Sequence, residues 1–253
     1  MIKIIYGKTA YDAGVNAAEV IADLLKSKKN AVLGLATGSS PIGMYKELIS
    51  KQQKGEISFK DVKSVNLDEY VGLAPTHDQS YAYFMHDNLF NHVDIKDENT
   101  NLPNGLAEDP AAECKRYDAV VKAMGGVDIQ VLGIGNNGHI GFNEPSDVFS
   151  KGTGLVDLTD STIDANARFF ASRDLVPTQA LSMGVGQIME ADKILLLAMG
   201  KGKAEILEKS LFGDVTPAVP ASILQFFKGE VVVCADEDAL SVILEKHPEA
   251  VSK

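Results

Sequence analysis

The segment 133–145, GIGNNGHIGFNEP, combines one histidine and one carboxylate with closely spaced glycines. His139 can exchange protons near neutral pH, and Glu144 could orient its imidazole or hold it in the charged form. Asn137 could add an uncharged hydrogen bond. The three glycines before the histidine permit tight turns and close approach of a ligand, which a packing histidine would not need. The pattern therefore favours acid–base chemistry at this segment.

A pair of adjacent acids, Asp68 and Glu69, follows an apolar run in the segment 66–72, NLDEYVG. Adjacent side chains of an extended chain point to opposite sides, so we expect at most one of them to face a site. A carboxylate that is partly desolvated and close to a carbon acid can act as a base. Helix caps and solvated turn acids are equally common at such positions, and the sequence leaves both interpretations open.

The segment 35–41, LATGSSP, places small and hydroxyl residues directly before an expected helix that opens with Pro41, because proline suits a first helical position. Free backbone amides and the helix dipole favour an anion there. A serine-capped helix is the ordinary alternative, and phosphate binding is only slightly favoured over it. The expected phosphate ligands are Thr37, Gly38, Ser39 and Ser40.

Two cations, Arg168 and Lys203, follow later in the chain. A solvated surface charge is the common role for such residues. Lys203 opens an expected helix, where a cation is electrostatically unfavourable unless an anion is bound nearby. We therefore expect Lys203 to help bind an anion, whereas Arg168 has no such local signal.

Short apolar runs alternate with amphipathic segments along the chain, which predicts an α/β fold: a Rossmann-like, open, mostly parallel sheet with helices on both faces. The expected strands are apolar throughout, as in strands covered on both faces; they are 2–6, 31–35, 62–66, 129–132, 194–198 and 231–234. The expected helices are 10–27, 41–51, 80–90, 111–124, 178–191, 203–212 and 239–246.

The three polar segments each follow an expected strand, so parallel strands would bring them to one edge of the sheet, where such folds bind ligands. No composition break divides the chain, and we expect one domain over 1–253. The segment 146–167 is polar and weakly periodic, which marks it as a possible lid.

Composition limits the classes of partner. The net charge of −11 argues against nucleic acid and against an anionic membrane surface. No apolar run reaches the ~20 residues of a membrane span, and no secretory leader is recognisable. Two cysteines and isolated histidines predict no metal site. We expect a cytoplasmic protein that acts on a small molecule.

Taken in order, the motifs GIGNNGHIGFNEP, LATGSSP, NLDEYVGL, ARFF, VPTQALSMGVG and GKGKA resemble those of glucosamine-6-phosphate deaminases. The resemblance extends from the first strand to about Cys234. It implies conversion of glucosamine 6-phosphate and water to fructose 6-phosphate and ammonia, with no cofactor. It also implies Asp68 as the base between C2 and C1, His139 as the ring-opening group, and Glu144 and Asn137 as its relay. The phosphate would be held by residues 37–40, Arg168 and Lys203.

The chain departs from this family at two places. Many members have aspartate at the position of Asn137, which leaves Glu144 as the only carboxylate of the motif. The hexameric, allosterically activated members resemble one another in a basic stretch after the NEP, whereas Lys151 is the only cation in residues 146–158 of this chain. We therefore expect a monomer or a small homo-oligomer instead of a hexamer.

Two other functions remain open. A 6-phosphogluconolactonase would resemble this fold, but such enzymes carry a different pattern after the histidine. A regulator that senses a sugar phosphate without turnover would be expected to lose the acid and base or to add a DNA-binding segment. Ammonia release from an amino sugar phosphate separates these functions from a deaminase.

Overall fold

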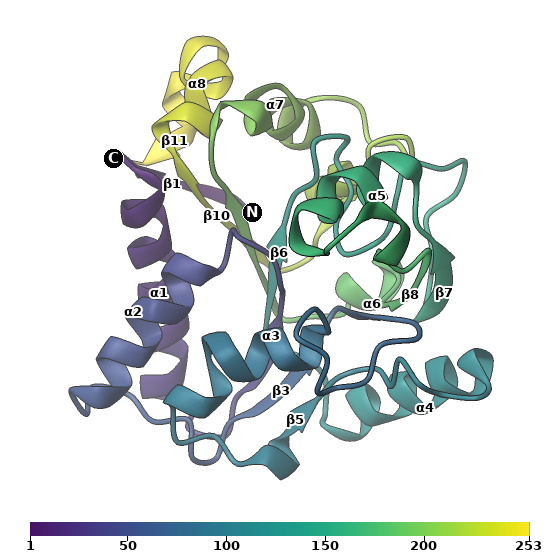
Figure 1. Cartoon of the computed structure of the whole chain (residues 1–253). Coiled ribbons are helices and arrows are strands. Elements are labelled where there is room, and N and C mark those ends of the chain that lie inside the picture. The colour runs from purple at the N-terminus through teal and green to yellow at the C-terminus, as the bar shows by residue number, and fades with distance from the viewer. Residues whose placement is uncertain (253) are drawn as a thin grey trace.

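A parallel sheet forms the centre of the molecule in this computed structural model, which describes residues 1–252 without the side chain of Ala165 (Figure 1). The strand order is β11-β1-β10-β9-β6-β2-β3-β5, and every neighbouring pair is parallel. The strands are β1 (Ile2–Gly7), β2 (Val32–Leu35), β3 (Lys63–Asn66), β5 (Thr100–Asn101), β6 (Ile129–Gly133), β9 (Lys193–Ala198), β10 (Glu230–Asp236) and β11 (Val251–Ser252).

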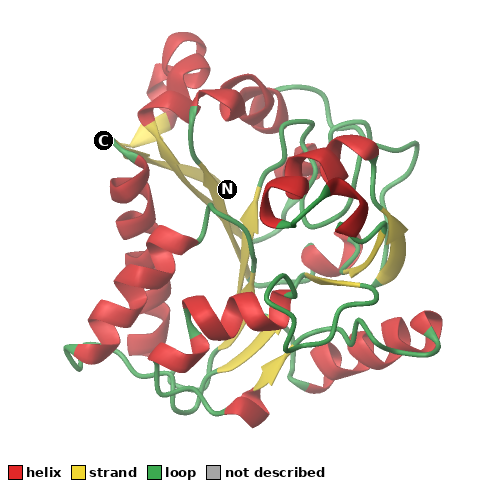
Figure 2. Cartoon of the chain, in the orientation of Figure 1, coloured by secondary structure: helices red, strands yellow, loops and turns green. Residues whose placement is uncertain are grey.

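Helices lie on both faces of this sheet (Figure 2), as the apolar strand pattern predicts. The α-helices are α1 (Ala10–Ser27), α2 (Ile42–Gln53), α3 (Tyr81–Asn88), α4 (Pro110–Ala123), α5 (Asp160–Asn166), α6 (Val185–Ile188), α7 (Ala204–Phe212) and α8 (Glu237–Lys246). Short 3₁₀ helices are η1 (Phe90–His92), η2 (Asp97–Asn99), η3 (Ala167–Phe169), η4 (Arg173–Leu175), η5 (Lys201–Lys203), η6 (Pro220–Phe226) and η7 (Pro248–Ala250).

The chain changes direction across the sheet between β2 and β6. From β2 it proceeds outward through β3 to β5, then returns to place β6 on the other side of β2 and continues through β9 to β10. Connections that leave a strand pair in opposite directions open a crevice at the carboxyl ends of those strands. The loops after β2 and β6 flank this crevice.

Two buried tyrosines fix the backbone just before the loops at this edge. Tyr45, on α2, donates a 2.6 Å hydrogen bond to the carbonyl oxygen of Ala36. The Tyr117 hydroxyl, from α4, accepts from the Asn66 amide at 2.9 Å and donates to the Asn66 carbonyl at 2.6 Å. Both phenol hydroxyls keep their hydrogen-bond partners although they are buried, so holding the strand ends in this way costs little free energy.

A second, antiparallel sheet lies beside the first, in the order β4-β8-β7. Its strands are β4 (Asp68–Tyr70), β8 (Gln179–Ser182) and β7 (Gly154–Asp157). The helix expected over 178–191 is therefore wrong: residues 179–182 pair with β4 and β7, and only α6 is helical. Pairing across distant segments overrides the local pattern here.

One further expectation needs correction. Helix α2 begins at Ile42, with Pro41 at the N-cap position instead of the first helical position. The segment 146–167 contains β7 and α5, although its sequence shows little periodicity. The six expected strands are all present, and the other expected helices are confirmed within a few residues at their ends.

Candidate active site

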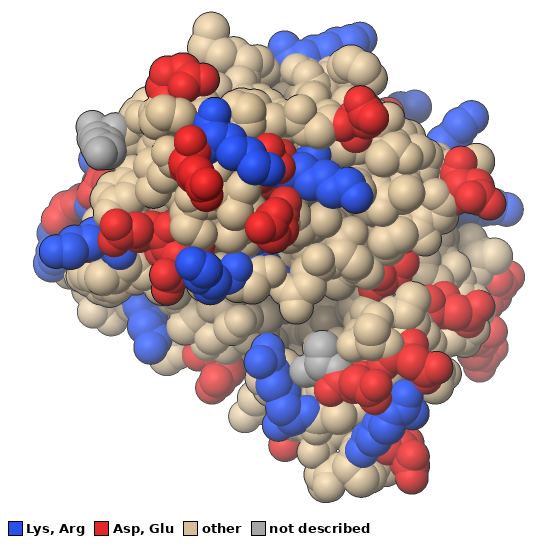
Figure 3. Space-filling view, turned by 90° about the horizontal axis from the view of Figure 1, so that it is seen from above, with Lys and Arg blue, Asp and Glu red and all other residues tan. Residues whose placement is uncertain are grey.

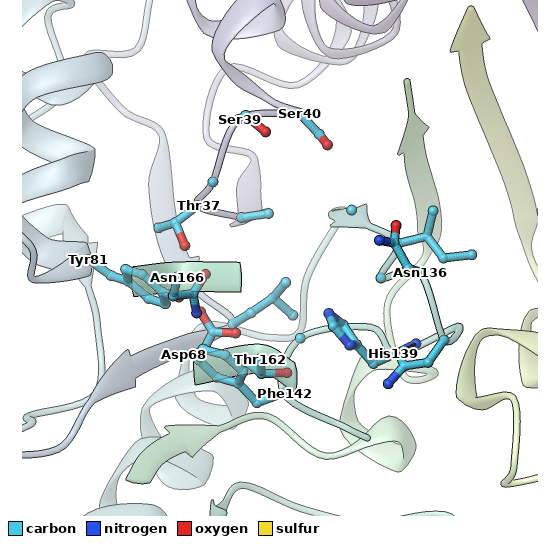
Figure 4. A pocket seen from close by; sticks show the side chains of 18 of the residues that line it. Thr37, Ser39, Ser40, Asp68, Tyr81, Asn136, His139, Phe142, Thr162 and Asn166 are labelled. Carbon is cyan, nitrogen blue, oxygen red and sulfur yellow. Dashed lines mark hydrogen bonds between the residues drawn. The ribbon is translucent and has the colours of Figure 1, made fainter. Parts of the chain in front are cut away.

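The loop after β2 forms one end of a pocket of about 460 Å³ at the crevice. Gly38 has a φ of +89°, which favours glycine over other residues. The loop leads into α2, and no side chain caps this helix. The serine-capped alternative is therefore contradicted. Ser39 and Ser40, which lie just before α2, line the pocket near the positive end of the helix dipole. Ser39 and Ser40 lie together at this end of the pocket (Figure 4).

Asp68, in β4, lines the pocket while its neighbour Glu69 does not. Burial raises the pKa of the Asp68 carboxyl to about 8, and the charge of Glu69 adds to that shift. Burial also raises the pKa of Glu69, although that carboxylate accepts hydrogen bonds from the amides of Tyr70, Tyr81 and Ala82 at 2.8–2.9 Å. Glu69 thus ties β4 to the start of α3, and Asp68 is the carboxylate available to a ligand.

His139 lies on the loop after β6, and the glycines around it explain how its ring fits. A methyl group at position 135 would collide with the imidazole of His139. Gly138 has a φ of +88°, and a Cβ there would lie 2.8 Å from Val219. Gly135 and Gly138 are therefore needed for this placement of the loop and of the His139 ring, whereas a side chain at Gly133 would meet only an ordinary contact.

Glu144 stands behind His139 and does not line the cavity. The His139 Nδ1 lies 3.3 Å from Glu144 Oε1, close enough for an ion pair, although the ring N–H is not aligned as a hydrogen bond. Asn137 Nδ2 donates a 2.6 Å hydrogen bond to Glu144 Oε2. Burial would raise the pKa of Glu144, but the nearby His139 ring and the hydrogen bonds from Thr162 and Asn137 outweigh it and lower this pKa to about 2.

Asn137 joins two parts of this loop. Besides its bond to Glu144, its Oδ1 accepts a hydrogen bond from the backbone amide of His139 at 3.2 Å. A neutral amide donates to Glu144 where an aspartate would repel it, so the loop places a single, hydrogen-bonded negative charge next to the imidazole.

The two predicted cations both line the pocket. Lys203 Nζ donates a 2.6 Å hydrogen bond to Asn136 Oδ1. Burial lowers the pKa of Lys203, and the nearby charge of Arg168 lowers it further. Among the described residues, neither cation has an acidic side chain within ion-pair distance. Two neighbouring cations without an acidic partner favour a bound anion.

The pocket brings nearly all predicted residues together. Asp68 and His139 face it on the side opposite Ser39 and Ser40, and Thr37 lies beside Tyr81 towards the Asp68 side (Figure 4). Sequence patterns did not single out several other lining residues; Asn136 and Phe142 lie within the segment 133–145, and the others lie in helices without a local chemical signal. These residues are Tyr81, Asn136, Phe142, Thr162 and Asn166.

The surface and the other potential sites add little to this picture. Acidic and basic side chains are interspersed over the face shown in Figure 3, without a continuous basic area. In the part of the chain that the structure describes, no cluster of three or more His, Cys, Asp or Glu side chains could hold a metal ion. No described helix combines the length and apolar character needed to cross a membrane.

Fold and pocket together define the class of protein: a Rossmann-like α/β protein with a pocket at the switch point of a parallel sheet, where such folds bind ligands. The model of one family, glucosamine-6-phosphate isomerases/6-phosphogluconolactonase, matches residues 8–233. The chain belongs to this family.

Relatives within the family narrow the comparison. The chain is 55% identical to a glucosamine-6-phosphate deaminase of Lachnoclostridium phytofermentans over 236 residues, covering 93% of this chain and all of the relative. It is also 55% identical to a glucosamine-6-phosphate deaminase of Clostridioides difficile over 230 residues, covering 91% and 92% of the two chains.

Solved structures give the same fold. A structure described as a monomeric glucosamine-6-phosphate deaminase superposes with a TM-score of 0.92 at 44% identity, covering 95% of this chain and 99% of that one. A 6-phosphogluconolactonase from Trypanosoma cruzi superposes with a TM-score of 0.77 over 98% of this chain and 97% of the other. Its 17% identity shows a shared fold only.

Proposed function

We propose that this protein converts glucosamine 6-phosphate and water to fructose 6-phosphate and ammonia. One observation carries the proposal: a buried carboxylate, Asp68, and an imidazole–carboxylate pair, His139 and Glu144, converge on a pocket whose other end suits a phosphate. The relatives at 55% identity, named as glucosamine-6-phosphate deaminases, support the same reaction.

Ring opening is the first step, and we assign it to His139. The imidazole exchanges a proton with the ring oxygen of the cyclic sugar and passes through a charged form. Glu144 stabilises this charge from 3.3 Å. Because the pKa of Glu144 is about 2, the carboxylate is ionised throughout the neutral range, and Asn137 helps to keep it so.

Isomerisation is the second step, and we assign it to Asp68. Opening the ring exposes an aldehyde at C1, which acidifies the hydrogen on C2. The Asp68 carboxylate removes that proton to give an enolamine and returns it to C1. The resulting ketimine at C2 is hydrolysed by water, and ammonia leaves. No electron transfer occurs, so the balance of the reaction needs no redox cofactor.

Phosphate binding supplies the orientation for both steps. The loop 37–40 and the start of α2 would hold the phosphate, together with Lys203 and Arg168. Thr37 lies nearer to Asp68 than the two serines do, so its side chain is placed for the sugar end as well. Binding energy from a group remote from C1 and C2 can be spent on positioning the reacting carbons.

The segment 146–167 would act as a lid in a single catalytic domain over 1–253. We also propose that the protein is a cytoplasmic monomer or small homo-oligomer without activation by an N-acetylated sugar phosphate. Lys151 remains the only cation in residues 146–158, and one solved relative is described as monomeric. Light scattering and assays with and without N-acetylglucosamine 6-phosphate test this point.

The test of the function is ammonia release from a panel of hexosamine phosphates, with 6-phosphogluconolactone hydrolysis measured in parallel. We expect ammonia from glucosamine 6-phosphate and no lactonase activity. Asp68→Asn should abolish ammonia release while substrate still binds, as measured by calorimetry. Lactone hydrolysis without ammonia release, or near-normal kcat in Asp68→Asn, would contradict the proposal.

A further inference from the structure

Thr162, on helix α5, lies at the edge of the pocket and has no role in the chemistry above. Its side chain is buried, and its hydroxyl donates a 2.5 Å hydrogen bond to Glu144 Oε1. The hydroxyl of Thr159, the N-cap of α5, donates in turn to the Thr162 hydroxyl at 3.1 Å. A hydroxyl that accepts one hydrogen bond and donates another has a fixed direction. Helix α5 therefore aims one donor at the carboxylate behind His139.

The oxygen that Thr162 contacts is the one that faces the imidazole. Glu144 Oε1 lies 3.3 Å from His139 Nδ1, whereas the other oxygen, Oε2, is held by Asn137. Asn137 comes from the same loop as Glu144. Thr162 is 18 residues further along the chain, so it is the contact that fixes Glu144 relative to another part of the structure.

The same short stretch carries a cation into the pocket wall. Helix α5 runs directly into η3, whose Arg168 lines the pocket. Asn166, the last residue of α5, donates a 2.9 Å hydrogen bond to the Tyr70 hydroxyl, which ties the stretch to β4. Residues 159–169 thus connect a cation assigned to the phosphate with the carboxylate behind His139.

We propose that Thr162 is a positioning residue for Glu144, and that Arg168, by engaging the phosphate, seats the stretch 159–169 on which Thr162 stands. Phosphate binding and ring opening are then coupled through one element instead of acting independently. This inference rests on the proposed deaminase function, whose failure has a separate signature described below.

The experiment is a double-mutant cycle of Thr162→Val with Arg168→Gln, measured as kcat/KM for glucosamine 6-phosphate. Valine keeps the shape of threonine and removes the donor. We expect Thr162→Val alone to lower kcat/KM about tenfold, mainly through kcat, because a hydrogen bond to a charged group is lost. In the Arg168→Gln background, Thr162→Val should lower kcat/KM only slightly, because residues 159–169 are then no longer held in place by a contact with the phosphate. Independent sites would give equal losses in both backgrounds.

Two controls separate positioning from a general structural effect. Thr162→Ser keeps the donor and should restore most of the activity. Thr100→Val is a matched control, because its hydroxyl also makes one hydrogen bond, to the Asp97 carbonyl oxygen at 2.8 Å, away from the pocket; its kcat/KM should equal that of the wild type. Equal losses in both backgrounds, no rescue by serine, or an equal loss in Thr100→Val would overturn the inference.

A measurement that needs no turnover completes the test. Fructose 6-phosphate should increase the hydrogen-exchange protection of residues 159–169 in the wild type and leave it unchanged in Arg168→Gln. Equal protection in both proteins would overturn the coupling. A wild-type protein that releases no ammonia would instead contradict the proposed function, and the exchange measurement would still decide the seating of the stretch.

Discussion

The pH dependence of catalysis should report the burial of Asp68. The base must be ionised to act, yet burial and Glu69 raise the pKa of its carboxyl to about 8. At pH 7 about one-tenth of the free enzyme then carries the active carboxylate, a cost of about 1.4 kcal/mol. Because kcat/KM follows the ionisation of the free enzyme, we expect it to rise about tenfold between pH 7 and its plateau above pH 8.

The amine of the substrate also titrates, so the assignment needs a perturbation that acts on the enzyme alone. Glu69→Gln removes the neighbouring charge and should move the acidic limb of kcat/KM to lower pH, because Asp68 then ionises more easily. The exposed Glu98→Gln serves as the matched control and should leave the limb in place. Ammonia release measured from pH 6 to 9 gives all three profiles.

If the acidic limb of kcat/KM lies at the same pH in the wild type and in Glu69→Gln, it reports titration of the substrate amine, and this reasoning is refuted. A direct ¹³C titration of the Asp68 carboxyl in the ligand-free protein gives an independent answer. A midpoint near 4 instead of 8 would show that the pocket solvates the carboxyl far better than its burial indicates.

Further predictions concern stability and single steps. The native Asp68 carboxyl binds its proton more tightly than the unfolded chain does, so the free energy of unfolding falls as pH rises from about 4 to about 8. At pH 9, Asp68→Asn should therefore melt at a higher temperature than the wild type. An unchanged or lower melting temperature would argue against the raised pKa of Asp68. His139→Gln should slow turnover of the cyclic sugar more than that of an open-chain analogue, whereas equal defects would remove His139 from ring opening. Lys203→Met should raise KM roughly tenfold or more by deleting a charged contact to phosphate, and an unchanged KM would remove Lys203 from the binding site. Gly135→Ala should push the His139 ring from its place, lowering kcat strongly, and full activity would show that the loop can adapt.

The fold followed from the sequence where local patterns and global packing agree. Apolar runs such as 194–198 are strands because burial on both faces selects residues that are apolar throughout. The helix predicted over 178–191 is wrong for the opposite reason. Its residues 179–182 are held in extended form by β4 and β7, which lie far from it in the chain, and no local pattern records those partners.

The site residues likewise fall into those that the sequence identified and those that it did not. Asp68, His139 and the loop 37–40 were identifiable because each follows a strand, and parallel strands necessarily bring such ends to one edge. Thr162 carried no signal, since a threonine near a helix start is usually a cap. Its contact with Glu144 exists only because α5 packs over the loop after β6.

The sequence by itself determined which chemical groups meet at the sheet edge, since the apolar strands and the polar or glycine-rich segments that follow them are visible locally in the chain. Only the tertiary structure decided their ionisation and their partners. Burial makes Asp68 a carboxyl with a pKa of about 8, and surrounding donors make Glu144 one with a pKa of about 2. Two acids of nearly equal intrinsic strength diverge because desolvation and hydrogen bonding depend on neighbours in space, not on neighbours in sequence.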